Sequence, residues 1–83
     1  MSKQLILITA PFNCGYCKRA QEELPTLCES KGWELIEIEN ERGKEQFPVE
    51  SYPTFMVRIN DKMVDTLKGY GGKDKILTEL KKY

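Results

Sequence analysis

The apolar positions along the chain follow two periods, one typical of strands and one typical of helices. Residues 5–8 are an unbroken apolar run, which favours a central strand covered on both faces. Over residues 14–28, apolar side chains recur every three or four positions, which predicts a helix that buries one face. Residues 33–39 are a predicted strand, and the alternation of apolar and acidic side chains over residues 36–39 indicates that it lies at or near the edge of a sheet. A strand, a helix and a second strand predict a parallel pair with a right-handed crossover.

Loop and helix-end residues separate these segments. Pro11, Asn13 and Gly15 interrupt the pattern between the first strand and the helix. Pro25 lies inside the helical pattern, and we expect a kink there because proline has no N–H to donate to the preceding turn. Gly32 predicts the end of the helix.

The second half of the chain predicts a hairpin and a closing helix. Residues 40–50 are polar and are expected to form a loop with a short helical turn. Residues 54–59 and 62–67 are predicted strands, and Asn60-Asp61 between them favours a tight turn. Residues 73–83 carry apolar side chains at helical spacing, which predicts an amphipathic helix. The whole order predicts one α/β domain over residues 1–83, a four-stranded mixed sheet with helices on its faces.

Composition narrows the classes of function. The chain has 83 residues with 13 basic and 13 acidic side chains, so no charge surplus suggests nucleic acid or an anionic membrane as the partner. The apolar runs are too short to cross a bilayer, and the first residues have no signal-peptide pattern. We therefore expect a monomeric cytoplasmic protein.

The cysteine and histidine counts exclude several kinds of site. Three cysteines are too few, and odd in number, for a secreted disulfide scaffold. The chain has no histidine and no second C-x-x-C, so we expect no structural zinc site, since such sites need four ligands. The absence of histidine also excludes mechanisms that use an imidazole base.

The motif Cys14-Gly15-Tyr16-Cys17 is the main candidate for chemistry. A thiol at a helix N-terminus can have its pKa lowered from about 8.5 to roughly 3.5–7.5, which produces the reactive thiolate. Cys14 is expected at that terminus, and Lys18 adds positive charge nearby. Cys17 lies one turn further into the helix. We therefore predict Cys14 as the nucleophile and Cys17 as the resolving thiol. Taken alone, the motif also fits half of a metal site or a chance pair.

The arrangement of motifs resembles the thioredoxin/glutaredoxin superfamily over essentially the whole chain. The shared features are a strand, the dithiol at residues 14–17 on a helix, a second strand, and residues 52–54 before a hairpin and a last helix. In that family the matching proline is cis and lies beside the dithiol, and the preceding residue presents its backbone to an extended substrate. The resemblance implies these roles for Pro53 and Tyr52. Without it, Pro53 would be an ordinary trans proline at the start of a strand.

Some positions resemble the glutaredoxin branch. Tyr16 is similar to the tyrosine of the glutaredoxin Cys-Pro-Tyr-Cys motif, and the N-terminus is similarly short. Residues 71–74 resemble the Gly-Gly-x-Asp stretch with which glutaredoxins hold the γ-glutamyl carboxylate of glutathione. This implies that Gly71 and Gly72 bind the carboxylate and that Asp74 accepts a hydrogen bond from the ammonium group. The alternative is a flexible turn before the last helix.

Other positions resemble thioredoxins. The pair Pro53-Thr54 is similar to the thioredoxin Pro-Thr pair. However, the tryptophan that precedes the thioredoxin motif is Asn13 here, and the buried acid six residues before the first cysteine is Ile8. How the proton of Cys17 is handled is therefore left open, and we predict no redox potential.

We interpret the chain as a thiol–disulfide oxidoreductase that reduces protein or glutathione disulfides without a tightly bound cofactor. Glutathione or a flavoprotein reductase would restore the dithiol, and the resemblance suggests ribonucleotide reductase as one client. An alternative hypothesis is an iron–sulfur module, because some glutaredoxins that lack the motif proline hold a [2Fe–2S] cluster between two chains with glutathione. A third is a redox-inactive interaction domain.

The remaining candidates are weaker. Cys28 falls on the inner face of the helix and is predicted to be a buried, inert thiol. Phe12 and Tyr70 fit equally well as the rim of an active site and as core residues. Four carboxylates look like solvated faces instead of an acid–base pair: Glu22, Glu23, Glu37 and Glu39.

Overall fold

The computed structural model describes residues 2–10, 14–40 and 51–83. Over these residues the chain forms, in order, β1 (Lys3–Thr9), α1 (Gly15–Lys31), β2 (Glu34–Glu39), β3 (Thr54–Ile59), β4 (Lys62–Lys68) and α2 (Lys73–Leu80). The strands form one sheet in the order β2-β1-β3-β4. β1 and β2 are parallel, whereas β3 is antiparallel to both β1 and β4. The predicted α/β class and mixed four-stranded sheet are confirmed.

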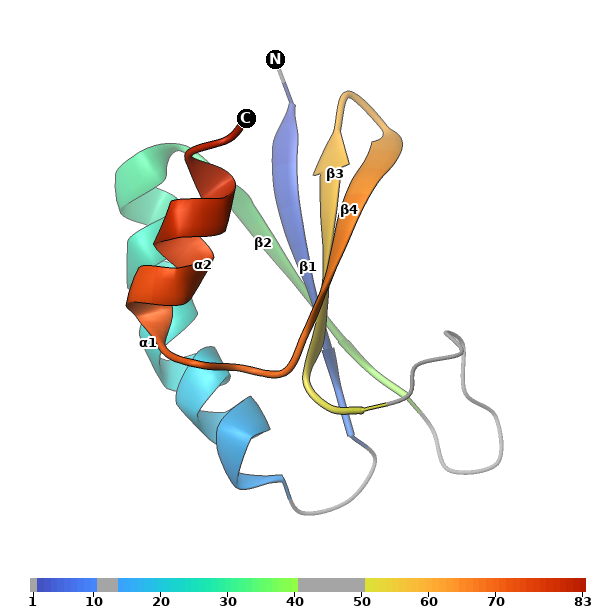
Figure 1. The fold of residues 1–83 in the computed structure, drawn as a ribbon, viewed down its shortest axis with the longest axis vertical. Coiled ribbons are helices and arrows are strands. Elements are labelled where there is room, and N and C mark those ends of the chain that lie inside the picture. The colour runs from blue at the N-terminus through green and yellow to red at the C-terminus, as the bar shows by residue number, and fades with distance from the viewer. Residues whose placement is uncertain (1, 11–13, 41–50) are drawn as a thin grey trace.

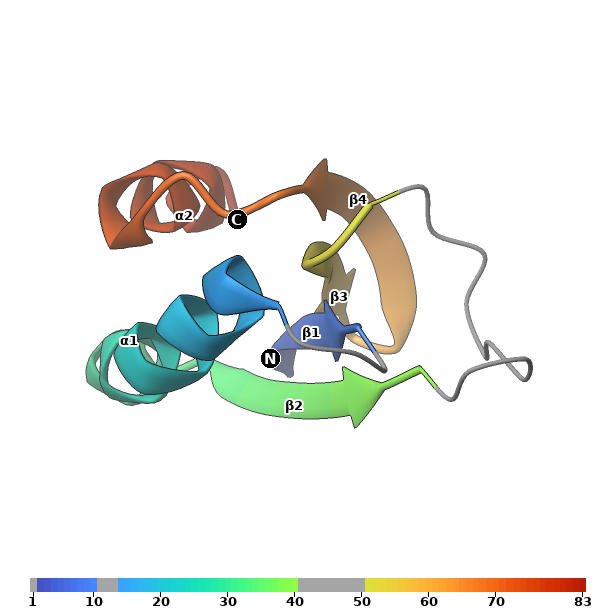
Figure 2. The ribbon, with the colours of Figure 1, turned by 90° about the horizontal axis from the view of Figure 1, so that it is seen from below.

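The two described helices lie on the same face of the sheet (Figures 1 and 2). The sequence predicted helices on the faces of the sheet, whereas both described helices cover one face, and the core explains this difference. Leu5 and Leu7 of β1 and Phe55 and Val57 of β3 belong to one cluster of buried side chains with residues of both helices. Side chains alternate along a strand, so these four residues project to the face that α1 and α2 cover.

The central position of β1 follows from its continuous apolar run. Residues 5–8 are each at most 2% exposed, and β1 pairs with β2 on one side and with β3 on the other. β2 is an edge strand of this sheet, and Glu34, Glu37 and Glu39 on it are exposed. The predicted central and edge strands are therefore both confirmed.

Helix α1 begins after Cys14 and ends at Gly32. Gly32 has φ 75° in the left-handed region, which glycine adopts without a steric penalty from a Cβ atom. The predicted end of the helix is thus confirmed. Pro25 lies inside α1, which continues beyond it to Lys31 without a break.

The hairpin and the C-terminal segment differ slightly from expectation. Asn60 and Asp61 have φ 50° and 67°, as a two-residue primed turn requires, so the predicted hairpin is confirmed. Helix α2 ends at Leu80, three residues before the predicted end at Tyr83. Instead of continuing the helix, the Tyr83 carbonyl accepts a hydrogen bond from Lys3 Nζ at 2.7 Å. The predicted loop over 41–50 lies outside the described residues.

We expect Gly32→Ala to lower the free energy of unfolding by about 1 kcal/mol, because alanine is strained in the left-handed region. Gly15→Ala is the matched control. Gly15 lies in the first turn of α1, and a Cβ there meets nothing within 4 Å, so this change should be neutral or slightly stabilising. Urea unfolding of the reduced proteins measures both values. Equal effects of the two substitutions would contradict the assignment of Gly32.

Candidate active site

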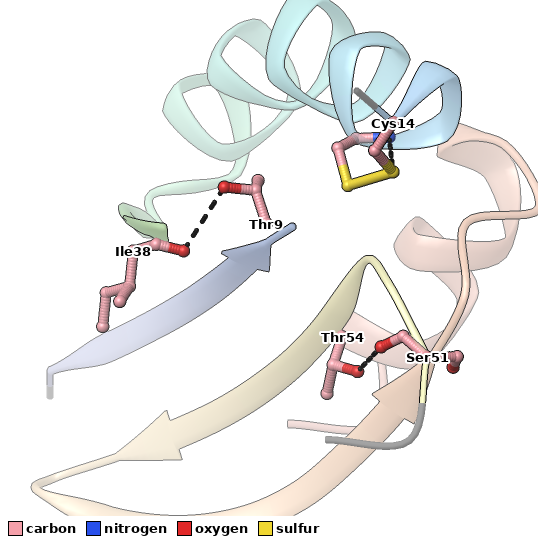
Figure 3. Close-up of a disulfide and its surroundings, with 6 residues drawn as sticks. Thr9, Cys14, Ile38, Ser51 and Thr54 are labelled. Carbon is pink, nitrogen blue, oxygen red and sulfur yellow. Dashed lines mark hydrogen bonds between the residues drawn. A yellow bond between two sulfur atoms is a disulfide. The ribbon is translucent and has the colours of Figure 1, made fainter. Parts of the chain in front are cut away.

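The sulfur of Cys14 lies at the N-terminal end of α1. Cys14 is the N-cap residue, with extended backbone at φ −140°, and its sulfur accepts a hydrogen bond from the backbone N–H of Cys17 at 3.2 Å (Figure 3). The first turn of α1 contains no acidic residue. Free N–H groups and the helix dipole favour negative charge at this position. The local structure would therefore stabilise a thiolate at Cys14 once the disulfide is reduced.

Cys14 and Cys17 are joined by a disulfide bond (Figure 3). Their Cα atoms are 5.3 Å apart, within the range that a disulfide spans without backbone movement. Cys14 is half-buried, whereas Cys17 is only 4% exposed. Cys14 is therefore the more exposed of the two cysteines, and the roles of nucleophile and resolving thiol stay predictions.

A shallow pocket of about 230 Å³ lies beside the disulfide. Both cysteines line it, together with residues from the ends of β1 and β2 and the second turn of α1: Thr9, Ala10, Lys18, Gln21 and Glu39. Glu39 is opposite Thr9 in the parallel ladder, so the two strand ends meet at the dithiol. The pocket is thus lined by one cationic and one anionic side chain in addition to the two cysteines.

Glu39 is exposed as predicted, but its place beside the dithiol was not predicted from the sequence. It was assigned only to a solvated face, and it also lines the pocket of the dithiol. The sequence did contain a signal for this position. Glu39 is the last residue of the second predicted strand, which is parallel to the strand that leads into the motif, and parallel neighbours end at the same edge of the sheet. Ile8 occupies the position at which thioredoxins have a buried acid, and it is fully buried. The side chain of the next residue, Thr9, projects to the opposite face of the sheet.

Glu23 corrects the prediction that its carboxylate belongs to a solvated face. The carboxylate instead accepts a hydrogen bond from the hydroxyl of Tyr70. Tyr70 is 6% exposed and packs in the core, with its ring centroid 6.1 Å from that of Phe55. Of the two readings of Tyr70, the structure therefore supports core packing. Burial and the neighbouring Glu23 carboxylate raise the pKa of Tyr70. Phe12 lies outside the described residues, as do Pro11 and Asn13.

The peptide bond between Tyr52 and Pro53 is cis, as the resemblance implied. This turn enters β3 and lies next to the N-terminal end of α1 (Figures 1 and 2). The Pro53 carbonyl accepts a hydrogen bond from the Gly69 N–H at 2.8 Å, and the Thr54 hydroxyl donates to the Ser51 carbonyl at 2.7 Å (Figure 3). The turn is therefore anchored to the end of β4 and closed on itself.

The Tyr52 hydroxyl has a partner that the sequence did not reveal. It accepts a hydrogen bond from Asn40 Nδ2 at 3.1 Å. Asn40 is fully buried and was predicted only as the first residue of a polar loop. Tyr16, by contrast, is 60% exposed, next to Cys17 in the chain.

The predicted glutathione site lies at the start of α2. Gly72 is the N-cap residue of α2, with φ 107° and no side-chain cap, and Asp74 is in the first turn. Gly71, Gly72 and Asp74 do not line the pocket at the disulfide. Gly71 lines a pocket of about 630 Å³ between β4 and α2, and Asp74 lines one of about 260 Å³ between α1 and α2. The structure does not bring these residues into the dithiol pocket.

Cys28 is buried in the core, as predicted. It is 1% exposed and forms no disulfide. Burial raises the pKa of its thiol to about 11, because the charged form is disfavoured in an apolar environment. This thiol is therefore unreactive in the folded protein near neutral pH.

Residues 2–10, 14–40 and 51–83 contain no cluster of metal ligands and no helix that could span a membrane. Within these ranges, no three His, Cys, Asp or Glu side chains gather as a metal site would require. Neither α1 nor α2 has the length and apolar character needed to cross a bilayer. The iron–sulfur hypothesis is not tested by this structure and stays a prediction.

A dithiol at the start of the helix in a strand–helix–strand unit, followed by a cis-proline turn, a hairpin and a last helix, defines a thioredoxin-like fold. No protein-family model matches the sequence, and no curated protein matches it. The comparison with solved structures, which depends on shape and not on sequence, does find matches.

Three of the similar structures are thioredoxins. Thioredoxin f2 of Chlamydomonas reinhardtii is 19% identical with a TM-score of 0.82, and the match covers 98% of this chain and 78% of the other. The periplasmic thioredoxin SoxS of Paracoccus pantotrophus is 22% identical with a TM-score of 0.74, covering 98% and 94%. Plasmodium falciparum thioredoxin is 24% identical with a TM-score of 0.73, covering 99% and 82%. The resemblance predicted from the sequence is thus confirmed for the fold.

The two charges in the dithiol pocket should act on Cys14 in opposite directions. In the reduced protein, Glu39→Gln should raise the rate of Cys14 alkylation by iodoacetamide at neutral pH about twofold, because it removes a negative charge that disfavours the thiolate. Lys18→Gln should lower that rate by a similar factor. Glu37→Gln is the matched control, since Glu37 is an exposed carboxylate on the same strand that does not line this pocket. A rate change in Glu37→Gln as large as in Glu39→Gln would refute a local effect.

Burial of Cys28 predicts a pH dependence of stability. Burial raises the pKa of this thiol from 9.0 to about 11 in the folded protein, so the stability it contributes is complete below about pH 9 and is lost as the pH rises toward 11. We expect the free energy of unfolding to fall over this interval by more in the wild type than in Cys28→Ala. Urea unfolding at several pH values measures the difference between the two proteins. Parallel pH profiles would show that the buried thiol is not linked to folding.

Proposed function

We propose that this protein is a thiol–disulfide oxidoreductase that reduces disulfides through Cys14 and Cys17. The observation that carries the proposal is the position of the Cys14 sulfur. Cys14 is half-buried at the N-cap of α1, its sulfur accepts a hydrogen bond from the Cys17 N–H at 3.2 Å, and it forms a disulfide with Cys17, a residue only 4% exposed. One accessible and one shielded sulfur are what a two-step exchange needs.

The first step is attack by the Cys14 thiolate on one sulfur of the substrate disulfide. A bond forms between Cys14 and that sulfur, the substrate S–S bond breaks, and the other substrate sulfur leaves as a thiolate that takes up a proton. The positive end of α1 stabilises the Cys14 thiolate before the attack. The product of this step is a mixed disulfide.

The second step releases the substrate. The Cys17 thiol loses its proton and attacks the sulfur of Cys14, so that the Cys14–Cys17 bond forms and the mixed disulfide breaks. The second substrate sulfur leaves and is protonated. The substrate has then gained two electrons and two protons, and the protein has the Cys14–Cys17 disulfide of Figure 3.

The cis-proline turn and the exposed Tyr16 are the proposed substrate contacts. The turn that enters β3 lies next to the start of α1 (Figures 1 and 2). Its residues Tyr52 and Pro53 would align an extended segment of substrate against the sulfurs. Tyr16 is 60% exposed and offers an apolar surface to the same segment. Client proteins would be disulfide-bearing, with ribonucleotide reductase as the candidate that the family resemblance suggests.

Regeneration of the dithiol needs an external reductant, either glutathione or a flavoprotein reductase. Support for glutathione is the free N-terminus of α2 at Gly72, which has no side-chain cap and could bind a carboxylate, with Asp74 and Gly71 beside it. The proposal includes no tightly bound cofactor, a monomeric state and a reducing compartment such as the cytoplasm.

Cysteine substitutions test the proposed roles. Cys14→Ser should abolish reduction of insulin disulfides, because it removes the nucleophile. Cys17→Ser should accumulate a mixed disulfide with the substrate, detectable by non-reducing electrophoresis and mass spectrometry. Cys28→Ala is the matched control and should keep the activity, since Cys28 is buried away from the pocket. Full activity in Cys14→Ser would refute the proposal.

The electron donor is tested by turnover with NADPH in two parallel assays, one with glutathione and glutathione reductase and one with thioredoxin reductase. Turnover that needs glutathione, and that falls in Asp74→Asn, would support a glutathione site at α2. Turnover with the flavoprotein alone would leave residues 71–74 as a plain turn.

A further inference from the structure

Asn40 is a buried polar residue that connects three parts of the active-site end. It follows the last residue of β2 and is 0% exposed. Its backbone N–H donates a hydrogen bond to the carbonyl of Thr9, the last residue of β1, at 3.1 Å. Its side-chain Nδ2 donates to the hydroxyl of Tyr52 at 3.1 Å. Asn40 thus joins the end of the strand that leads to the dithiol with the residue that precedes the cis proline.

The partner of this hydrogen bond is at the proposed substrate site. Tyr52 is half-buried and precedes Pro53, which is buried. On the other side of the turn, the Pro53 carbonyl is held by the Gly69 N–H at 2.8 Å. Among the described residues, the backbone of Gly69 and the side chain of Asn40 both anchor this turn, one at Pro53 and the other at Tyr52.

The chemistry of a buried amide makes this contact costly to lose. Fully buried asparagine is uncommon, and a buried polar group that loses its partner costs about 1–3 kcal/mol. An apolar side chain could fill the same space without such a risk, so packing alone does not require an amide at this position. The amide adds a directional hydrogen bond, and this bond fixes the position of the Tyr52 hydroxyl.

We propose that Asn40 is a positioning residue for substrate binding. By holding the Tyr52 hydroxyl, it fixes the Tyr52 backbone at the place where an extended polypeptide substrate pairs with it. This inference rests on the proposed function. It concerns the recognition of extended protein disulfides and not the chemical step, because neither Asn40 nor the Tyr52 hydroxyl lines the pocket of the two cysteines.

The test compares the ratio of two KM values in variants of the whole protein. The substrates are insulin, as an extended protein disulfide, and bis(2-hydroxyethyl) disulfide, which has no backbone to pair. The variants are Tyr52→Phe, Asn40→Ala and the double variant. Tyr83→Phe is the matched control, since it removes a hydroxyl that donates to Asp65 at 3.2 Å near the C-terminus, at the other end of the molecule (Figure 1).

We expect Tyr52→Phe to raise the KM ratio of insulin to the small disulfide about fivefold, as the loss of one hydrogen bond of about 1 kcal/mol implies. The kcat for insulin should change by less than twofold. Asn40→Ala should produce a similar shift, and the double variant should be no worse than either single one, because both changes remove the same bond. Tyr83→Phe should leave the ratio unchanged.

Other outcomes would contradict either the positioning role of Asn40 or the proposed function as a whole. A Tyr52→Phe variant with the same KM ratio as Tyr83→Phe, or additive effects in the double variant, would refute the positioning role while the proposed function stands. A wild-type protein that reduces neither substrate would refute both proposals. Urea unfolding checks that each variant is folded, and if Asn40→Ala is not, Tyr52→Phe alone decides between these outcomes.

Discussion

The hydrogen bond from the Cys17 N–H to the Cys14 sulfur, 3.2 Å long, depends on α1 beginning at one particular residue. If the helix began one residue later, Cys14 would lose this donor, and if it began earlier, the sulfur would no longer lie at the positive end of the helix dipole. The start of α1 is in turn fixed by packing, because Ala20, Leu24 and Cys28 are buried against the sheet. The reactivity of one sulfur is therefore supported by the apolar core along the whole helix.

The topology then determines which groups surround that sulfur. The parallel pairing of β1 and β2 places Thr9 beside Glu39, so a carboxylate from a segment distant in sequence reaches the dithiol pocket. The antiparallel pairing of β3 with β1 places the Tyr52-Pro53 turn at the same end of the sheet. Asn40 follows β2 and joins these parts through Thr9 and Tyr52. One end of the sheet thus brings together the proposed nucleophile, its charged neighbours and the proposed substrate-binding turn.

Sequence patterns predicted those features that depend on neighbours along the chain. The buried run of β1, the capped helix with Gly32 at its end and the Asn60-Asp61 hairpin are local, and all are confirmed. The cis bond before Pro53 followed only from the family resemblance, since no local pattern demands it. Features that depend on register were missed, because periodicity along one segment does not show which residues of another segment lie opposite it.

Three polar residues illustrate this limit. Glu23 and Glu39 follow an exposed pattern in the sequence, yet one is the partner of a buried tyrosine and the other lines the dithiol pocket. Asn40 begins a polar run, yet it is fully buried. The placement of both described helices on one face of the sheet (Figure 2) is likewise a property of the assembled core. The position of the cysteine pair at the start of α1 was predictable from the sequence, whereas the surroundings of the pair required the structure.

The most direct test of the account is a single turnover of the reduced wild-type protein with insulin. The reaction is quenched with acid before it is complete, and the disulfide bonds are then mapped by mass spectrometry of peptides. Acid stops thiol–disulfide exchange by protonating the thiolates, so the transient mixed disulfide is preserved. The account predicts that the substrate sulfur is attached to Cys14 and that the Cys14–Cys17 disulfide replaces it at later times. A mixed disulfide on Cys17, or oxidised substrate that disappears without any intermediate on Cys14, would contradict it.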